Sequence, residues 1–262
     1  MSPEGQLMPP GGSAIVVGSF TMNDGQWFER HQHGAHQLAW ARSGVLAVRA
    51  DDATWVLPAS MALWIPAGTA HATGAVRAAL LRSLYFWPDR CPVDWASPQV
   101  VAVSALLREL ICHLAEDGLD PAARRRAERV VLDQLRPVSV ATVRAPMPDE
   151  PRARRVAQAL LADPADGRSL AEWGKAVGAS GRTLARAFVA GTGMTYGHWR
   201  TQARLQAAMP LLAAGATVAS VAHRVGYGSP SAFVAAFRRS VGVPPGQYFT
   251  PDDGSPDDGS AG

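Results

Sequence analysis

The sequence of 262 residues contains a single lysine, Lys175, and only two cysteines, Cys91 and Cys112. These cysteines form no metal-type pair and no disulfide framework, so nothing in the sequence requires an oxidising compartment. From the sequence no signal peptide is expected, and no apolar run is long enough to cross a membrane. These absences predict a cytoplasmic protein with no membrane partner. Because nearly all of the 25 basic residues are arginine, the arginine preference reflects composition and is not by itself evidence for guanine recognition.

The last hundred residues contain the same pattern twice, once over 170–200 and again over 218–249. Each copy has a short amphipathic segment, a glycine, a serine and a second segment with two large apolar residues four positions apart. With one inserted residue, Gly228, the copies align at these pairs: Gly178 with Gly226, Ser180 with Ser229, Leu184 with Phe233, Phe188 with Phe237, Gly193 with Gly242 and Trp199 with Tyr248. The pattern predicts helix, tight turn, helix, twice over.

Local capping residues specify where these helices begin and end. The predicted caps are a Ser169–Glu172 capping box, a Gly178 stop, a Ser180 start, a Thr217 start, a Gly226 stop and a Ser229-Pro230 start. Such residues satisfy the unpaired backbone groups of the first and last helical turns. Two short helices joined by a tight turn can place the second helix in the DNA major groove, whereas a single copy is about as often an ordinary helical hairpin.

The charge distribution favours the DNA-binding interpretation. The segment 152–250 contains twelve Arg or Lys and three Asp or Glu residues, a formal charge of +9, whereas the whole chain carries only +3. The rest of the chain therefore sums to −6, of which four charges are aspartates in the last twelve residues. A surface that binds DNA must neutralise phosphates, and a packing module need not be basic.

The segment from Ser169 to Phe249 resembles the AraC/XylS family of transcription regulators. The resemblance rests on Leu184-Ala185-Arg186-Ala187-Phe188, Gly193-Met194, Arg204-Leu205, the run from Val225 to Phe233, and the ending from Phe237 to Tyr248. It covers a full DNA-binding domain and implies two helix-turn-helix units joined by a central helix over about 196–212. Pro210 lies near the end of that helix, and an interior proline predicts a kink or an early end there.

The resemblance also implies which residues contact double-stranded DNA. In the first recognition helix these are Arg182, Ala185 and Arg186, and arginine can bind guanine with two hydrogen bonds; contact with phosphates alone is the alternative. The second helix offers small side chains suited to a thymine methyl group and one hydroxyl. Phe233 and Phe237 are expected in the core. The full predicted set is Ser180, Arg182, Thr183, Ala185, Arg186, Ser229, Ser231, Ala232 and Ala235.

The first ninety residues have a different character, with short segments rich in Val, Leu, Ile and Trp between Gly, Pro and Asp. Strands are expected over 14–20, 36–41, 44–50, 54–57, 62–65 and 78–86. Many short strands with close turns indicate a β-sandwich or a β-barrel.

Two spaced groups of residues in this region resemble the two motifs of the cupin barrel. The first group is Gly25, His31, His33, Gln37 and Gly44, and the second is Pro66, Gly68 and His71. In that family a histidine pair, an acid and a distant histidine hold a metal. Here Gln37 takes the place of the acid, and Ser60 and Ala75 stand where the second motif has glycine and asparagine.

The residues themselves are compatible with this site, since His31 and His33 are two apart in a strand and point to the same side. With His71 they offer three imidazoles to Zn, Ni, Co, Cu or Fe, and Gln37 is a fourth, weaker ligand. A neutral amide cannot offset a divalent charge or act as a general base, which makes enzyme chemistry less favourable. The alternative is a vestigial barrel whose histidines form hydrogen bonds around an empty or organic-ligand pocket. His36 is interpreted as a flanking residue, or as an alternative ligand.

Two helices are expected between these regions, over 98–116 and 121–135, the first with an apolar stripe suited to core packing or to a dimer face. The Arg124–Arg126 run is interpreted as a solvated face. The sequence thus predicts a two-domain α+β protein, arranged as follows: a cupin-like β-barrel sensor (1–97), a helical connector and dimerisation region (98–136), a linker (137–151), an all-α double helix-turn-helix domain (152–250) and a disordered tail (251–262).

These features predict a sequence-specific transcriptional regulator, and not an enzyme, controlled by a metal or small ligand in the barrel. The expected partners are promoter or operator DNA, the effector, RNA polymerase in the case of an activator, and a second copy of the chain. The effector is expected to act through the helices of 98–135. Two alternatives stay open: a cupin metalloenzyme with an accessory helical domain, and a DNA-binding regulator with a purely structural barrel.

Overall fold

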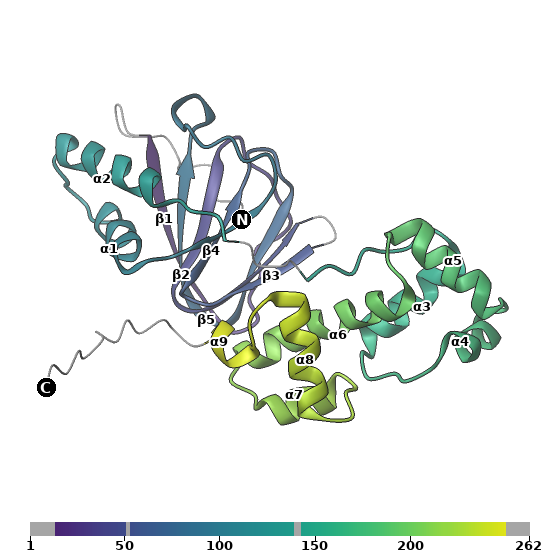
Figure 1. Ribbon diagram of the computed structural model, residues 1–262. Coiled ribbons are helices and arrows are strands. Elements are labelled where there is room, and N and C mark those ends of the chain that lie inside the picture. The colour runs from purple at the N-terminus through teal and green to yellow at the C-terminus, as the bar shows by residue number, and fades with distance from the viewer. Residues whose placement is uncertain (1–13, 51–52, 139–142, 250–262) are drawn as a thin grey trace, which may run out of the picture.

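The computed structural model describes residues 14–50, 53–138 and 143–249, which form a β-sheet domain followed by a helical domain (Figure 1). The predicted tail, residues 251–262, lies outside the described residues. In the part of the chain described, antiparallel strands form one sheet in the order β1-β5-β2-β4-β6, with β3 paired to β2. The strands are β1 (Ile15–Met22), β2 (His36–Ala50), β3 (Ala53–Leu57), β4 (Met61–Ile65), β5 (His71–Phe86) and β6 (Gln99–Ala102).

A bulge at Gly44 bends the long strand β2 and gives the sheet its barrel-like curvature. Gly44 has a φ of +79°, and the register between β2 and β5 shifts between Ala41 and Leu46. Before the bulge Ala41 faces the barrel interior, and after it Leu46 does. An extra residue in one strand moves the side chains that follow to the opposite face. The two strands predicted over 36–41 and 44–50 are therefore one continuous strand.

One part of the outer face of the sheet is covered by α1 (Ala105–Leu114) and α2 (Pro121–Gln134). Trp40 and Trp64 of the sheet pack in one core with Leu107, Ile111 and Leu114 of α1. The apolar stripe that the sequence offered to either a core or a dimer face is thus largely occupied by core packing.

The prediction of a helix from residue 98 was wrong for its first residues. Gln99–Ala102 forms strand β6, which pairs with β4, and α1 begins only at Ala105 after the Ser104 cap. Val100 packs in the barrel interior, and Val101 packs in the core between the sheet and α1. A short run that is apolar on both faces has no periodicity that separates a strand from a helix.

The C-terminal domain consists of two helical units joined by one long helix. Its helices are α3 (Pro151–Ala162), α4 (Leu170–Val177), α5 (Gly181–Thr192), α6 (Tyr196–Ala213), α7 (Val218–Arg224), α8 (Pro230–Val241) and α9 (Pro245–Phe249). A short turn of 3-10 helix, η2 (Pro88–Arg90), belongs to the preceding domain. The first unit, α3 to α5, packs around Trp173, Phe188 and Trp199. The second unit, α7 to α9, packs around Phe233 and Phe237, both fully buried, which confirms their predicted core role.

Pro210 does not end the central helix early, which was one of the two outcomes expected there. Helix α6 runs through Pro210 and ends at Ala213. A proline there removes one backbone hydrogen bond to the carbonyl four residues earlier. The neighbouring Met209 and Leu212 are buried in the core of the second unit, and this packing holds the last turn in helical form.

The second helical unit lies directly on the barrel. Ala47 of β2 and Val56 of β3 share one core with Leu205, Met209 and Leu212 of α6. Figure 1 shows α6 to α9 against the lower end of the sheet, whereas α1 and α2 lie on the side of the barrel away from α3 to α5. The barrel therefore contacts the second unit through its own strands.

Candidate DNA interface and histidine cluster

The caps that define the two helix-turn-helix units form as the sequence predicted. The reciprocal box between Ser169 and Glu172 is present, and Gly178 ends α4 in the left-handed region with a φ of +70°. In the second unit Thr217 caps α7 and Ser229 caps α8, with Pro230 at the first helical position. These caps are local, because each capping side chain bonds the backbone N–H three residues later. The turns that aim α5 and α8 are thus fixed by adjacent residues.

A groove of about 510 Å³ lies along α5, the second helix of the first unit. Among the residues that line it are Arg182 and Arg186, which are both exposed and lie one helical turn apart. Neither arginine has an ion-pair partner among the described residues. Ala185, also predicted to face DNA, is half-buried and does not line the groove. Of the three side chains assigned to bases, the structure therefore brings the two arginines together.

The hydroxyls at the start of α5 are engaged in capping. Ser180 Oγ accepts a hydrogen bond from the Thr183 backbone N–H at 3.0 Å, and the two side-chain hydroxyls lie 2.9 Å apart. Both residues line the same groove. They order the first turn of α5, which presents its free backbone N–H groups and partial positive charge at that end of the groove.

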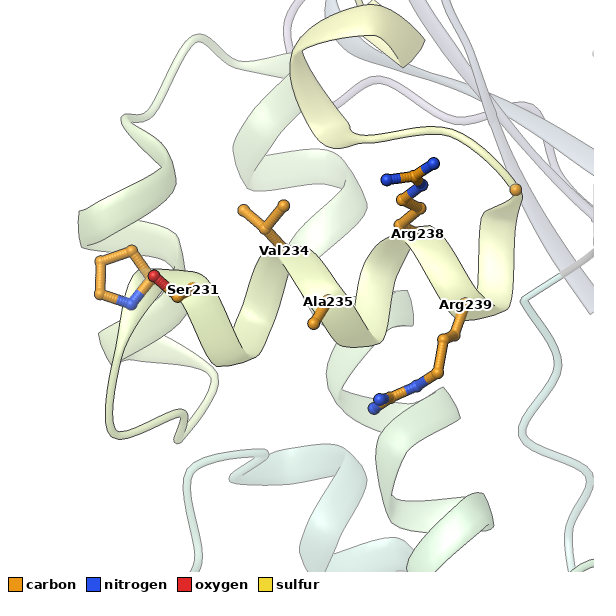
Figure 2. Close-up of a pocket in the computed structure, with 7 residues that line it drawn as sticks. Ser231, Val234, Ala235, Arg238 and Arg239 are labelled. Atoms are coloured by element: carbon orange, nitrogen blue, oxygen red, sulfur yellow. The ribbon is translucent and has the colours of Figure 1, made fainter.

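A second groove, of about 740 Å³, follows the exposed face of α8. Figure 2 shows Ser231, Val234 and Ala235 succeeding one another along the helix, with Arg238 and Arg239 near its end. Ser231 and Ala235 were predicted for this face. Val234 and the arginine pair were missed, because the family pattern was carried over only for the first turns of the helix. Val234 follows Ser231 by three residues, and Arg238 and Arg239 follow Ala235 by three and four. Helical periodicity could therefore have placed them on the same face.

The other two residues predicted on α8 lie elsewhere. Ala232 is exposed but does not line the groove, and its backbone N–H donates to Ser229 Oγ at 3.2 Å. Ser229 thus serves as the cap of α8. The surface available for recognition on this helix is a hydroxyl, then an apolar patch, then two guanidinium groups. Such a surface suits a methyl group beside phosphates or guanine.

Inside the barrel, the three predicted histidines come together. One nitrogen from each of His31, His33 and His71 lies within 4.8 Å of the others. The backbones of His31 and His71 form an isolated antiparallel bridge, with hydrogen bonds of 2.9 and 2.8 Å. That bridge joins residues forty positions apart, and it places their rings 4.5 Å apart between centroids.

Each histidine ring is oriented by a backbone carbonyl two residues away. The Nδ1 atoms of His31, His33 and His71 lie 2.8, 2.7 and 2.9 Å from the carbonyl oxygens of residues 29, 35 and 69. His33 lies between two acceptors, the Ala35 carbonyl at Nδ1 and the Gln37 side-chain oxygen at Nε2. For His31 and His71 the carbonyl only accepts, so Nδ1 carries the proton and the Nε2 lone pair of the neutral ring is left for the cluster. This is the orientation that metal-binding histidines have when a second hydrogen bond fixes their tautomer.

His71 is the most deeply buried member of the cluster. Burial lowers its pKa to about 4, with a smaller contribution from the nearby His31 and His33. The ring is therefore neutral at pH 7. Its Nε2 atom is buried and has no hydrogen-bond partner among the described residues. An unpartnered buried acceptor costs free energy unless something binds it, so the residues present fit a cation that accepts a lone pair.

Gln37 lies beside this cluster, as predicted. Its Oε1 atom lies 3.0 Å from His33 Nε2, and its Nε2 donates a hydrogen bond to Ser83 Oγ at 2.8 Å. The ring of Tyr85 lies 5.3 Å from that of His33, and burial raises the pKa of its hydroxyl. The Gln37 oxygen only accepts, so it pairs with His33 when Nε2 carries a proton. A metal bound at His33 Nε2 would displace that proton and leave the Gln37 oxygen available as a ligand.

His36 is separate from the cluster. Its ring stacks on Trp64 at 5.1 Å, and its Nδ1 atom accepts a hydrogen bond from the Ala67 backbone N–H at 3.1 Å. Burial, and then the neighbouring His33, lower its pKa. These contacts place His36 on the outer face of the sheet as a flanking residue.

Among the described residues, two side-chain hydrogen bonds connect the barrel to the helical domain. Gln206 Nε2 donates to Thr54 Oγ1 at 2.8 Å, and the Tyr248 hydroxyl donates to the Val56 carbonyl at 2.9 Å. The Tyr248 side chain is buried, and burial raises the pKa of its hydroxyl. Both bonds end on β3, which contacts the helical domain together with Ala47 of β2 and Val76 of β5. Within the described residues, no helix is long and apolar enough to cross a membrane.

Comparison with known proteins matches both parts of the chain. Residues 173–250 match a family model described as a helix-turn-helix domain, and residues 13–131 match one described as an AraC-like ligand binding domain. The HTH-type transcriptional regulator NimR of Escherichia coli is 32% identical over 222 residues, which are 84% of this chain and 81% of NimR. The HTH-type transcriptional regulator RipA of Corynebacterium glutamicum is 40% identical over 117 residues, which are 45% of this chain and 34% of RipA.

Two solved structures align with one or both domains of the chain. The apo form of a ToxT variant from Vibrio cholerae is 9% identical, with a TM-score of 0.38, over 90% of this chain and 97% of that chain. The C-terminal domain of AraT, a response regulator from Geobacillus stearothermophilus, is 28% identical, with a TM-score of 0.36, over 38% of this chain and 84% of that chain.

Proposed function

Since the chain belongs to the AraC-type family of helix-turn-helix transcriptional regulators, we propose that it recognises a two-segment operator through α5 and α8, under the control of the histidine cluster in its barrel. The main support for DNA recognition is the pair of exposed grooves on α5 and α8, which are equivalent helices of the two units. They belong to a segment of charge +9. Two recognition helices on one rigid support read neighbouring segments of the major groove.

The first groove supports direct reading of bases. Arg182 and Arg186 reach a common space from one helical face, and a guanidinium can bind O6 and N7 of guanine together. In the second groove Val234 and Ala235 offer apolar contact to a thymine methyl group, and Arg238 and Arg239 neutralise phosphates at the end of the helix. The operator we propose therefore has a guanine-containing segment and a thymine-containing segment.

The arrangement of the three histidines supports control by a metal. A divalent transition metal of the Zn, Ni, Co, Cu or Fe class would be held by Nε2 of His31, His33 and His71, with the Gln37 amide oxygen as a weaker neutral ligand. Such an ion supplies positive charge and geometric constraint to the barrel interior. The carbonyls beside the three Nδ1 atoms orient the rings for such an ion.

The same residues support a sensor in preference to an enzyme. The amide of Gln37 cannot take up a proton at neutral pH, so the cluster has no general base in the position where a carboxylate would provide one. The curated relatives named above are transcriptional regulators. The chain is thus proposed to use its barrel for binding.

Two partners complete the proposal. We propose that the chain forms a homodimer through the α1–α2 surface, where Leu106 is 51% exposed, since twofold assemblies are the commonest oligomers. An activating role requires contact with RNA polymerase. Sedimentation of the free protein and transcription from a promoter with the selected operator test these two parts separately.

The proposed control is tested by measuring metal content and DNA affinity on the same samples. Operators are first selected from a random duplex pool, and the metal-free protein is then titrated with Zn²⁺, Ni²⁺, Co²⁺, Cu²⁺ or Fe²⁺. We expect one ion per chain and a change in operator affinity of about 5- to 150-fold, the usual size of coupling between two sites. The double variant His31→Ala, His33→Ala should lose both effects.

His36→Ala is the matched control, because its ring lies outside the cluster and packs on Trp64. It should bind the ion and respond as the unmodified chain does. Loss of the ion without any change in DNA affinity would support a vestigial barrel instead. Turnover of an organic substrate by the metal-loaded protein would support the metalloenzyme.

A further inference from the structure

The loop between α3 and α4 reaches from the first helical unit to the second. Gly226, in the turn between α7 and α8, has a φ of +82°, and a Cβ placed there would lie 2.8 Å from Ala165 Cα and 3.0 Å from the Ala165 carbonyl oxygen. No side chain fits in that space, so the two backbones are in direct contact. The turn of the second unit therefore rests on residues 163–168 of the first.

Arg204 of the central helix α6 lies at this contact and touches both sides. Its Nε donates a hydrogen bond to the Pro164 carbonyl at 2.9 Å. Its guanidinium lies over the ring of Tyr227 at 5.4 Å from the centroid, and its Nη2 would be 2.7 Å from a Cβ at Gly226. The guanidinium is partly desolvated, which lowers its pKa. One side chain thus joins the loop of the first unit to the turn of the second.

Each side of this contact is fixed to its own unit. On the first side Arg168 forms an ion pair of 2.6 Å with Asp166 and stacks over Trp173 at 3.5 Å. The Tyr196 hydroxyl donates to the Arg168 carbonyl at 3.0 Å. Trp173 is a buried core residue of the first unit, so movement of the loop requires movement of that core.

On the second side Tyr227 packs edge-on against Phe233 at 5.5 Å between ring centroids. Phe233 is a fully buried residue of α8. The contacts therefore continue from the core of the first unit, through the loop and Arg204, to the helix that carries the second groove.

We propose that Arg204, Gly226 and Tyr227 form a clasp that fixes the separation and rotation of α5 and α8, and that Arg204 thereby sets the spacing of the two operator segments. This inference rests on the proposed DNA-binding function. Apart from the clasp, the two units are joined along α6, which spans about 27 Å for its 18 residues. A bend or twist of that helix changes where the second recognition helix meets the DNA. Arg204 is a positioning residue in this scheme and touches no base.

The test uses the full chain and the selected operator in three forms, with the natural spacing and with one base pair added or removed between the segments. For the unmodified chain we expect roughly tenfold or greater loss of affinity for the altered spacings, comparable to a mismatched base pair. Arg204→Ala should retain binding to the natural operator within about fivefold and lose most of the spacing penalty. Gly226→Ala, which pushes a methyl group into the clasp, should act in the same direction.

Arg224→Ala is the matched control, because it removes an exposed arginine from α7 in the second unit. It should keep the full spacing penalty. Arg204→Lys retains the charge but not the planar group over Tyr227, so it should relax spacing while leaving the salt dependence unchanged. Thermal melting identifies any variant that fails to fold, and Arg204→Lys replaces Arg204→Ala if that variant unfolds.

An equal spacing penalty in folded Arg204→Ala, Arg204→Lys and the unmodified chain overturns the clasp and leaves DNA recognition by α5 and α8 intact. Equal affinity of the unmodified chain for all three spacings also overturns it. Absence of any operator binding by the unmodified chain contradicts the proposed function itself.

Discussion

Gln206 of α6 donates a hydrogen bond from Nε2 to the Thr54 hydroxyl of β3 at 2.8 Å, across 152 positions of sequence. With the bond from Tyr248 to the Val56 carbonyl, it attaches the central helix and the end of the second unit to one strand of the barrel. The sequence suggested that α1 and α2 would carry a signal between the domains. Direct hydrogen bonds from α6 and α9 to β3 provide a further route beside those helices.

The interdomain bonds give a first prediction. Thr54→Ala and Tyr248→Phe together remove two hydrogen bonds, which costs about 1 kcal/mol each in the stability of the contact. We expect the metal-dependent change in DNA affinity to shrink, because occupancy of the barrel then biases the second unit less. Metal uptake should be unchanged, as measured on the same samples. A full response in the double variant would contradict transmission through β3.

DNA binding should depend strongly on salt. If about four phosphates are contacted, counterion release predicts that affinity falls on the order of a hundredfold between 50 and 200 mM salt. Fluorescence anisotropy with a labelled operator measures this. An affinity that is indifferent to salt would exclude a phosphate-binding surface on the +9 segment.

Arg186→Ala should weaken operator binding by about 1 to 3 kcal/mol and relax the preference at one or two base pairs, because a bidentate contact to guanine is lost. Lys175→Ala is the control, since it removes one exposed positive charge from α4, outside the groove. Binding is measured on a set of operators with single substitutions. A uniform loss on all of them would identify Arg186 as a phosphate contact.

The segment that faces α8 should be sensitive to the thymine methyl group. Replacing thymine by deoxyuridine there removes one methyl group from contact with Val234, and we expect a loss of about 0.8 kcal/mol for each methyl that is buried. The same replacement in the segment that faces α5 is the control. Val234→Ala should reduce the difference between thymine and deoxyuridine. If the two bases bind equally well, the apolar patch on α8 does not read methyl groups.

Much of the helical domain could be predicted because its signals are local. Ser169, Gly178, Ser180 and Ser229 act on backbone groups within three residues, or through their own φ angle, so the sequence alone determines where α4, α5 and α8 begin or end. The pairing of Arg182 with Arg186 follows from helical periodicity.

The histidine cluster was predicted from spacing and resemblance, and the fold determined its chemistry. The bridge between His31 and His71 depends on strand pairing over forty residues. The carbonyl contact that orients each ring depends on how the chain turns beside that ring. No periodic pattern in the sequence indicates the bridge or the carbonyl contacts.

The sequence by itself determined two helix-turn-helix units, a basic segment to carry them and three histidines for one site, because caps, periodicity and charge are properties of neighbouring residues. Only the tertiary structure decided that a bulge at Gly44 reverses the faces of β2, that Arg204 joins the two units and that β3 supports the second. Each of these needs contacts between residues distant in sequence, whose formation depends on the cooperative packing of the whole chain.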